Sequence, residues 1–483
     1  MNNSNKFKGL LFLQVIIALL ISSCTKNLDE LRKDPEAVAK AIPASFLSNA
    51  LYTATSTLVT QGHTINDQLM QVSVLKQNDN EIHRYIILPN NYTSAWTPLY
   101  KPLVNIEEMI KSARSTNDPN YESIGLTLKS WILSNITDIY GDVPFTEALR
   151  GVEAITTPKF DPQKQIYDSI FVYLERANNG YVLNKPLGGE DLLFNATSSA
   201  ANMMKWKKFT NSLRLRLLMR VEKKGAEYTN QIKMILSDPS KYPMMQNVSD
   251  GAALYYTGIT PFLNPFFGYR DFDFNQKLQY SAFFIDYLKG VDDPRLPVIA
   301  TKTSGGEYLG VPTGYPTSQQ SVISNTSYST YQPDLKSNDK MGSILQYAEV
   351  EFLLSEAALK GYSSDDPKVH YDNGIKASMN YWGITSIPSD FLNNPEIAYD
   401  GTLEQIMTQK YFALFGNGFD QWFEYRRTGF PVMVPGPEMA NDGMMPSRIP
   451  YPLIESIYNL DNYNQAVTQM GGDDINVKVW WQK

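Results

Sequence analysis

Two pairs of neighbouring carboxylates are the residues best suited to catalysis in this chain. Asp271 with Asp273, and Asp292 with Asp293, offer the two positioned acids that glycoside hydrolysis requires. Acidic residues at such spacings are, however, far more often solvated or used to cap loops. The sequence also contains no G-x-S-x-G motif, no P-loop and no dinucleotide-binding fingerprint, so it does not indicate an enzyme. A glycoside hydrolase is the less favoured alternative.

Residue types that bind metals are too few and too scattered to form a site. The three histidines, His63, His83 and His370, lie far apart and show no metal-ligand spacing. Cys24 is the only cysteine, which excludes an intramolecular disulfide and a thiolate metal site. We accordingly expect neither a metal nor another cofactor.

Aromatic side chains interleaved with polar ones favour sugar binding. A sugar presents flat C–H faces that stack on aromatic rings, and hydroxyl groups that need polar partners beside them. From residue 252 to 335, sixteen of 84 residues are Tyr or Phe, and frequent Pro and Gly predict loops and short strands there. The candidate ligand-binding residues are Trp96, Phe267, Tyr269, Arg270, Phe272, Asp273, Tyr315 and Tyr331.

Helices on both sides of this segment must hold these residues in place. Apolar residues recur at intervals of three and four, the period of a helix that is buried along one face. The predicted helices span residues 100–114, 128–140, 166–178, 206–224, 349–360, 369–382, 403–415 and 419–427. In the fourth of these, Arg214, Arg216 and Arg220 fall mostly off the apolar stripe. Adjacent helical pairs predict a mostly α fold of the α-solenoid or bundle type, although no 34-residue repeat is visible.

The first 24 residues have the features of a lipoprotein signal. Lys6 and Lys8 precede an apolar run from residue 10 to 21, about half of the roughly 20 residues that a membrane-spanning helix needs. The stretch from Ile21 to Cys24 resembles a bacterial lipobox, in which the cysteine is acylated and becomes the mature N-terminus. We predict a signal peptide over 1–23, lipidation at Cys24 and a flexible stalk over 24–36, so that outer-membrane lipid holds the protein.

The charge balance excludes other partners. The net charge is −7, and loss of Lys6 and Lys8 with the signal peptide makes it −9. No basic block is present, so we expect no nucleic-acid partner. No later stretch is apolar for 18 residues, so we expect no membrane-spanning helix in the mature chain.

Several long motifs resemble the SusD/RagB-like outer-membrane lipoproteins, and specifically their SusD-like branch. The first is WILSNITDIYGDVPFTEAL at residues 131–149. Similar motifs follow in the expected order at residues 205–221, 292–297, 349–361, 409–431, 448–452 and 471–481. The resemblance covers nearly all of the mature chain and predicts a single SusD-like domain over 37–483, with its aromatic, loop-rich segment at about 239–346.

The resemblance implies a fold and a function. It implies tetratricopeptide-like helical pairs with an irregular remainder that carries the ligand site, which often includes an aromatic at the position of Trp96. Such proteins face the cell exterior, an orientation that Asp29-Glu30 loosely supports. They act as the lid of a SusC-like TonB-dependent transporter and capture oligosaccharides, or peptides in the RagB-like case, without catalysis. Aromatic content favours the sugar, and the peptide remains the alternative.

The motif residues themselves are more readily explained by folding than by ligand contact. We expect Asp138, Tyr140, Gly141 and Asp142 to end a helix, with Gly141 supplying a positive φ. We expect Phe415, Phe419, Trp422 and Phe423 to pack in the core, and Arg426 and Arg427 to bind acids or last-turn carbonyls.

Overall fold

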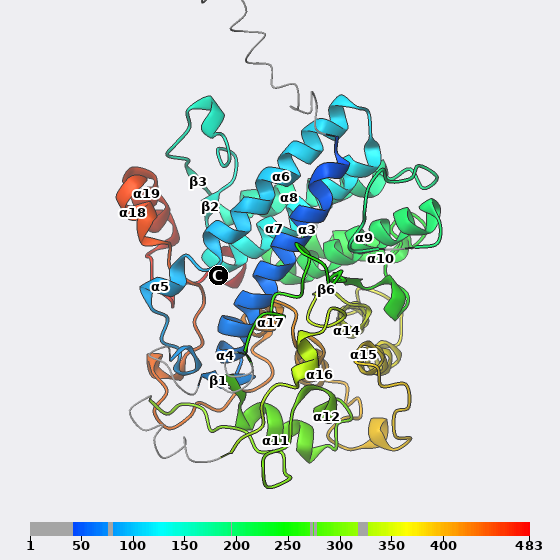
Figure 1. The fold of residues 1–483 in the computed structure, drawn as a ribbon, viewed down its shortest axis with the longest axis vertical. Helices are drawn as coiled ribbons and strands as arrows, with labels where there is room; N and C mark the ends of the chain where they lie inside the picture. Colours follow the sequence, from blue (N-terminus) through cyan, green and yellow to red (C-terminus); the bar gives the residue numbers. More distant parts are fainter. Residues whose placement is uncertain (1–41, 76–80, 195, 271–273, 275–277, 317–326) are drawn as a thin grey trace, which may run out of the picture. The chain divides into compact units, whose positions relative to one another are not determined.

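Helices form wherever the sequence shows an apolar period of three and four. The computed structural model describes residues 42–75, 81–194, 196–270, 274, 278–316 and 327–483 (Figure 1). Residues 43–483 form their own unit, and its core is drawn from residues of that unit alone. The candidate residues Phe272 and Asp273, and the predicted lipidation site Cys24, lie outside the described residues.

The long helices confirm each helix predicted from the sequence and add others that the periodicity did not reveal. The N-terminal group comprises α3 (Ala44–Gln61), α6 (Trp96–Ser115), α7 (Pro119–Tyr140), α8 (Gln163–Gly180), α9 (Ser199–Val221) and α10 (Ala226–Ser237). The C-terminal group comprises α14 (Tyr347–Leu359), α15 (Pro367–Tyr381), α16 (Leu403–Ala413), α17 (Asp420–Thr428), α18 (Leu453–Tyr458) and α19 (Leu460–Met470). Short helices are α4 (Asp67–Leu69), α5 (Pro89–Tyr92), α11 (Ala282–Gly290) and α12 (Leu296–Ile299).

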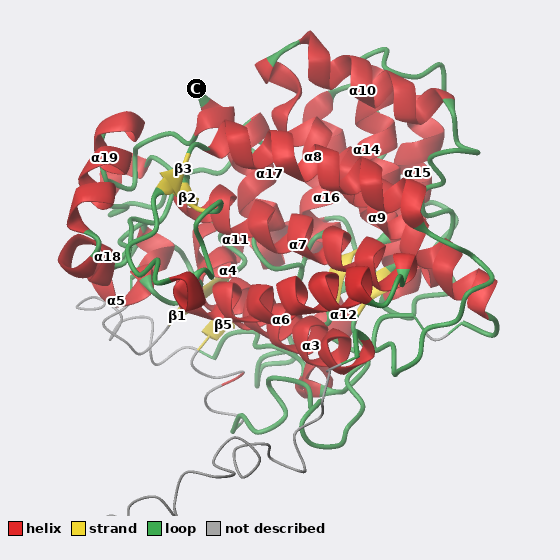
Figure 2. Ribbon diagram, turned by 90° about the horizontal axis from the view of Figure 1, so that it is seen from above, coloured by secondary structure: helices red, strands yellow, loops and turns green. Residues whose placement is uncertain are grey.

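Neighbouring helices pack in pairs. Helix α3 packs on α6, α6 on α7 and α7 on α8, while α9 packs on α10, and α14 packs on α15 and α16. Figure 2 shows the first of these helices side by side in successive rows. The fold is therefore mostly α, built from tetratricopeptide-like helical pairs, as the sequence predicts.

The aromatic-rich middle of the chain forms loops and short strands, which also confirms the sequence-based expectation. Strand β1 (Ser73–Leu75) pairs antiparallel with β5 (Leu278–Tyr280), with Ser73 opposite Tyr280. Strand β2 (Val143–Pro144) pairs with β3 (Phe160–Asp161), and β4 (Ala252–Ala253) pairs with β6 (Ser343–Leu345). The β1–β5 and β4–β6 ladders tie the middle segment to residues on either side of it, whereas the β2–β3 ladder lies between α7 and α8.

The second half of helix α9, residues 209–221, is buried on all sides, so its three arginines are buried even though they fall off the apolar stripe. The helix contacts α7, α8, α10, α14 and β6, and only its first half keeps partly exposed side chains. Arg214, Arg216 and Arg220 are each at most 3 % exposed. Because a buried charge is costly unless it is paired, each of these arginines needs an acidic partner.

Acidic residues of the family-like motifs supply the partners of Arg216 and Arg220, while Arg214 pairs with Glu175 of α8. Arg220 binds Asp138 of α7 at 2.8 Å and Asp420 of α17 at 2.9 Å. Arg216 binds Asp420 at 3.2 Å and also pairs with Glu349. The Asp138 carboxylate accepts further hydrogen bonds from the Tyr167 hydroxyl at 2.8 Å and the Trp481 indole at 2.7 Å. This network joins helices that are far apart in the sequence.

A second buried cluster surrounds Glu356. Arg427 donates to both oxygens of Glu356, at 2.6 and 2.7 Å, and to Glu424 at 2.7 Å. Lys410 also binds Glu424, at 2.7 Å. Arg426 donates to the Asp138 carbonyl at 2.7 Å. The expectation that Arg426 and Arg427 bind acids and carbonyls is confirmed.

This cluster makes stability depend on pH in a defined direction. Burial alone would raise the pKa of Glu356, but Arg427 and Lys360 outweigh it and lower the pKa to about 2. The unfolded side chain titrates at about 4.3, so the stabilisation is complete above that pH and is lost as the pH falls towards 2. We therefore expect the difference in unfolding free energy between the wild type and Glu356→Gln to narrow between pH 5 and pH 3 in urea titrations. A difference that is as large at pH 3 as at pH 7 would contradict this assignment.

The remaining motif residues have the folding roles expected of them. Gly141 ends α7 with a φ of +90°, and a Cβ there would lie 2.7 Å from the Met470 sulfur. Only glycine both adopts this positive φ readily and has no Cβ to clash with Met470. Phe415, Phe419, Trp422 and Phe423 are buried in the core.

Candidate functional site

Two of the sequence-predicted ligand residues are part of the core. Trp96 is 6 % exposed, and its ring lies against Tyr140, with centroids 5.0 Å apart, and Tyr451, at 6.0 Å. Tyr331 is 0 % exposed, and its hydroxyl donates to Asp67 at 3.0 Å. Packing therefore occupies both rings, and in this conformation neither presents a face on which a sugar could stack.

Two other predicted residues present their rings to solvent from one turn. Phe267 is 60 % exposed and Tyr269 is 42 % exposed. We call residues 264–269 the aromatic turn. The main-chain N–H of Phe267 donates to the Asn264 carbonyl, and that of Tyr269 to the Phe266 carbonyl, both at 2.9 Å.

Hydrogen bonds of Asn264 and the buried ring of Phe266 hold the aromatic turn in place. The Asn264 amide donates to the carbonyls of Ser337, at 2.7 Å, and Lys340, at 3.2 Å. Phe266 is buried, and its ring contacts His63 at a centroid distance of 5.0 Å and Tyr269 at 5.4 Å. Exposed rings on a fixed backbone lose little conformational entropy when a ligand stacks on them.

Only some of the predicted ligand-binding residues are connected by contacts between their rings. Ring contacts run from Tyr269 to Phe266, then to Phe274, and from there to the buried Tyr331. Trp96 belongs to a different group of rings, on α6 and α7. Arg270, next to Tyr269, is exposed. Tyr315 is half-buried beside Gly314, which lies against Gly436.

The described carboxylate pair is structural. Asp293 is buried and binds Arg295 through both oxygens, at 3.0 and 2.6 Å, while Asp292 is exposed with a φ of +52°. Asp271 and Asp273 lie outside the described residues.

Among the residues that the structure describes, no group of three or more His, Cys, Asp or Glu side chains could hold a metal ion. Burial lowers the pKa of His83 to about 4, although Glu81 opposes this shift, so the side chain is neutral at physiological pH.

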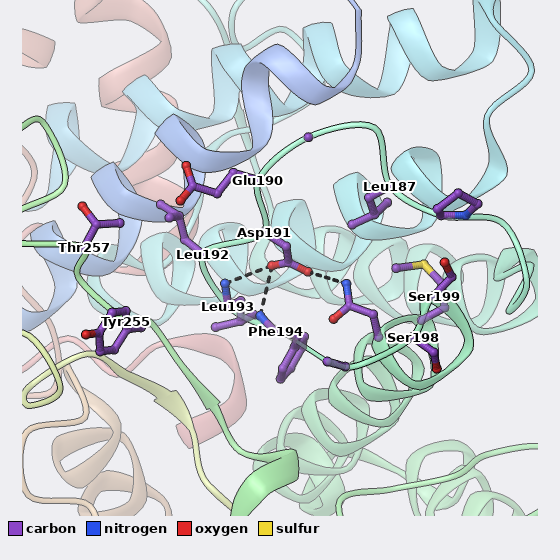
Figure 3. Close-up of a pocket in the computed structure, with 15 residues that line it drawn as sticks. Leu187, Glu190, Asp191, Leu192, Leu193, Phe194, Ser198, Ser199, Tyr255 and Thr257 are labelled. Carbon is purple, nitrogen blue, oxygen red and sulfur yellow. Dashed lines mark hydrogen bonds between the residues drawn. The ribbon is translucent and has the colours of Figure 1, made fainter. Parts of the chain in front are cut away.

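A hollow of about 730 Å³ lies between the N-terminus of α9, the segment before it and the loop after β4 at Tyr255 (Figure 3). We call it the Asp191 hollow. Its described lining residues are Pro186, Leu187, Gly189, Glu190, Asp191, Leu192, Leu193, Phe194, Ala196, Ser198, Ser199, Asn202, Met203, Tyr255 and Thr257. The volume lies within the range of small-molecule sites.

Asp191 organises the base of this hollow. Its carboxylate accepts hydrogen bonds from the main-chain N–H groups of Leu193 and Phe194, at 2.9 and 3.1 Å, from the Asn202 amide at 3.0 Å and from the Trp206 indole at 2.7 Å. Burial raises the pKa of Asp191 in spite of these bonds. No sequence pattern predicted the hollow, because its residues are of ordinary types and only Tyr255 and Thr257 belong to the aromatic-rich segment.

The structure thus combines a scaffold of tetratricopeptide-like pairs with two exposed aromatic rings on a fixed turn. The chain belongs to the SusD-like family, described as starch-binding and associating with the outer membrane, whose model matches residues 35–452. This confirms the resemblance seen in the motifs. No helix in the described part of the chain is both long and apolar enough to span a membrane. A search of curated proteins returns no match.

Solved structures agree with this assignment. A chitin-binding protein shares 26 % sequence identity over 91 % of this chain and 99 % of its own, with a TM-score of 0.76. A chitin-binding SusD homologue from Flavobacterium johnsoniae shares 22 % identity over 91 % and 98 %, with a TM-score of 0.77. A SusD homologue from Bacteroides fragilis NCTC 9343 shares 24 % identity over 90 % and 100 %, with a TM-score of 0.74.

Proposed function

We propose that this protein captures neutral oligosaccharides at the outer membrane and delivers them to a SusC-like TonB-dependent transporter, acting as its lid. Membership of a starch-binding family and likeness to chitin-binding proteins support a glycan as the ligand. The observation that carries the proposal is the aromatic turn, which holds Phe267 and Tyr269 exposed on a rigid support. Stacking on such rings is how a shallow site holds a sugar face.

The proposed ligand site is centred on Phe267 and Tyr269, and Arg270 follows them in the chain. Phe272, Asp273 and Tyr315 remain proposed from the sequence as further residues that bind hydroxyl groups or ring faces. Trp96 and Tyr331 have another role in this proposal. Both side chains are buried, so in this proposal they stabilise the fold and affect ligand binding only through the residues that they position.

A role in binding rather than catalysis accords with the chemistry of the carboxylates. Asp293 is held by Arg295, and its neighbour Asp292 is turned to solvent, so this pair does not converge on one ligand. A peptide ligand, as in the RagB-like case, would use the same scaffold and partner. No specific contact favours it over a sugar.

The proposal is tested with a soluble chain that starts at residue 25, which keeps the whole unit 43–483 and its core. Calorimetry against starch and chitin oligosaccharides, followed by chromatography of the recovered sugars, separates binding from hydrolysis. We expect binding with no cleavage products. Cleavage would identify a hydrolase, whereas peptide binding without sugar binding would identify the alternative lid.

Lipid attachment is proposed at Cys24, after removal of residues 1–23, with 24–36 as the stalk. Two or three acyl chains hold a protein at a membrane, whereas none leaves it free. Cys24→Ala is therefore expected to block acylation and to abolish incorporation of radiolabelled palmitate, with Ser23→Ala as the matched control that keeps the label. Equal labelling of the Cys24→Ala variant would contradict acylation at this residue. Surface exposure is tested separately, by protease accessibility in intact cells.

A further inference from the structure

An exposed ring stands at the edge of the Asp191 hollow, apart from the aromatic turn. The Tyr255 side chain is 60 % exposed. Its main-chain N–H donates to the Leu192 carbonyl at 3.2 Å, and the N–H of Thr257 donates to the Phe262 carbonyl at 2.9 Å, which fixes the backbone on which the ring is mounted. Figure 3 shows Tyr255 and Thr257 on one side of the hollow and Leu187 and Ser198 on the other. The ring is thus a second platform for stacking.

The lining of the hollow suits a neutral ligand that has both apolar faces and hydroxyl groups. Pro186 and Leu187 contribute accessible apolar surface, while Ser198 and Thr257 contribute hydroxyls. None of its described lining residues is Lys or Arg, and the exposed Glu190 adds a negative charge at the rim. An anionic ligand would meet no compensating cation there. These features together fit a sugar without acidic groups.

Helix α3 sets the distance between the hollow and the aromatic turn. Near the start of α3, the Ser48 hydroxyl donates to the Glu190 carbonyl at 2.9 Å, beside the hollow. Fifteen residues further on, where α3 continues into the helical turn Gly62–Asn66, the His63 ring contacts Phe266 of the aromatic turn. At about 1.5 Å per residue this separation is about 20 Å along the helix.

The chain segment between the two places packs on the same helix. Tyr52, one turn after Ser48, packs its ring on Phe262, with centroids 5.4 Å apart, and donates to the Leu263 carbonyl at 3.0 Å. The side chain of Ile259, in the segment between Tyr255 and the aromatic turn, is exposed. One segment, residues 255–269, therefore follows α3 and carries an exposed ring at each end.

We propose that the Asp191 hollow is a second subsite for the same oligosaccharide, so that a chain long enough to span about 20 Å occupies the hollow and the aromatic turn together. This inference rests on the proposed glycan-binding function. When two sites bind one chain, the second contact becomes intramolecular and the affinity rises without any change in either site. Short sugars occupy only one site at a time and lack this gain. The arrangement selects ligands by length.

The test compares short and long members of one series on the soluble chain. Chitobiose and chitohexaose, and in parallel maltose and maltohexaose, are titrated calorimetrically into the wild type, Tyr255→Ala and Tyr458→Ala. Tyr458 lies on α18 and is also exposed, but it belongs to neither site, so it is the matched control. For the series that binds, we expect the hexasaccharide to bind at least tenfold more tightly than the disaccharide. We expect Tyr255→Ala to remove that advantage while leaving disaccharide affinity at the aromatic turn unchanged.

The outcomes separate the two claims. Equal affinities for the two lengths in the wild type would overturn the second subsite but leave glycan binding intact, as would a length advantage that survives in Tyr255→Ala. Absence of binding to every sugar would overturn the proposed function itself. A thermal unfolding midpoint equal to that of the wild type establishes that the Tyr255→Ala variant is folded, as its exposure leads us to expect.

Discussion

Replacement of Arg427 by methionine is expected to lower the free energy of unfolding by about 3–5 kcal/mol. The guanidinium is buried and binds Glu356 through two hydrogen bonds and Glu424 through a third. Methionine fills most of the space but leaves two carboxylates in the interior with less positive charge to balance them. The loss is therefore much larger than that of the apolar contacts of one side chain.

Equilibrium urea unfolding of the variant and the wild type measures this effect. Arg176→Met is the matched control, because Arg176 binds Glu122 at 2.6 Å with its side chain largely exposed. An exposed ion pair contributes at most about 1 kcal/mol. Similar losses for the two substitutions would show that burial of the Arg427 cluster carries no special weight.

Combined replacement of Phe267 and Tyr269 by alanine is expected to weaken sugar binding about a hundredfold. Each ring that stacks on a sugar contributes on the order of 1.4 kcal/mol, which is a factor of about ten in affinity. Two rings that each contribute this much give a loss of about a hundredfold together. Asn264 holds the backbone of the turn through its own hydrogen bonds, so loss of the rings leaves that support in place. Calorimetry with the disaccharide reports this site without the contribution of a longer chain.

Two further variants make this prediction specific. The exposed aromatic control Tyr458→Ala should leave the affinity unchanged. Tyr331→Phe removes the hydrogen bond to Asp67 but keeps the ring, so it should reduce stability more than affinity. Wild-type affinity in the Phe267 and Tyr269 double variant would place the sugar elsewhere on the protein.

Periodicity predicted the helices well because burial along one face leaves a repeating mark in the sequence. Helix α7 and its end at Gly141 are examples, since the apolar stripe and the glycine are both local signals. Helix α3 escaped prediction because serine and threonine residues interrupt its apolar pattern. The burial of Arg216 and Arg220 could not be predicted either, because it depends on helices much later in the sequence.

The candidate site was harder to predict than the fold. A tyrosine or tryptophan has the same appearance in a sequence whether its ring faces a ligand or a neighbouring helix. Trp96 and Tyr331 face neighbours, whereas Phe267 and Tyr269 face solvent, and only tertiary packing distinguishes them. The Asp191 hollow is formed by Tyr255 and residues some sixty positions before it, so no local pattern could reveal it.

The hydrogen bond from Trp481 to Asp138 has a consequence for the order of folding. The two residues are separated by 343 positions, yet the carboxylate is buried and Trp481 is one of its hydrogen-bond donors. Domains generally begin to fold from the N-terminus as the chain emerges. Here Tyr167 and Arg220, on helices of the N-terminal group, already bind the acid, and Trp481 adds its hydrogen bond only when the end of the chain is present. The N-terminal helices can therefore pack around a paired acid, and the last residues of the chain then fasten the C-terminus to the end of α7.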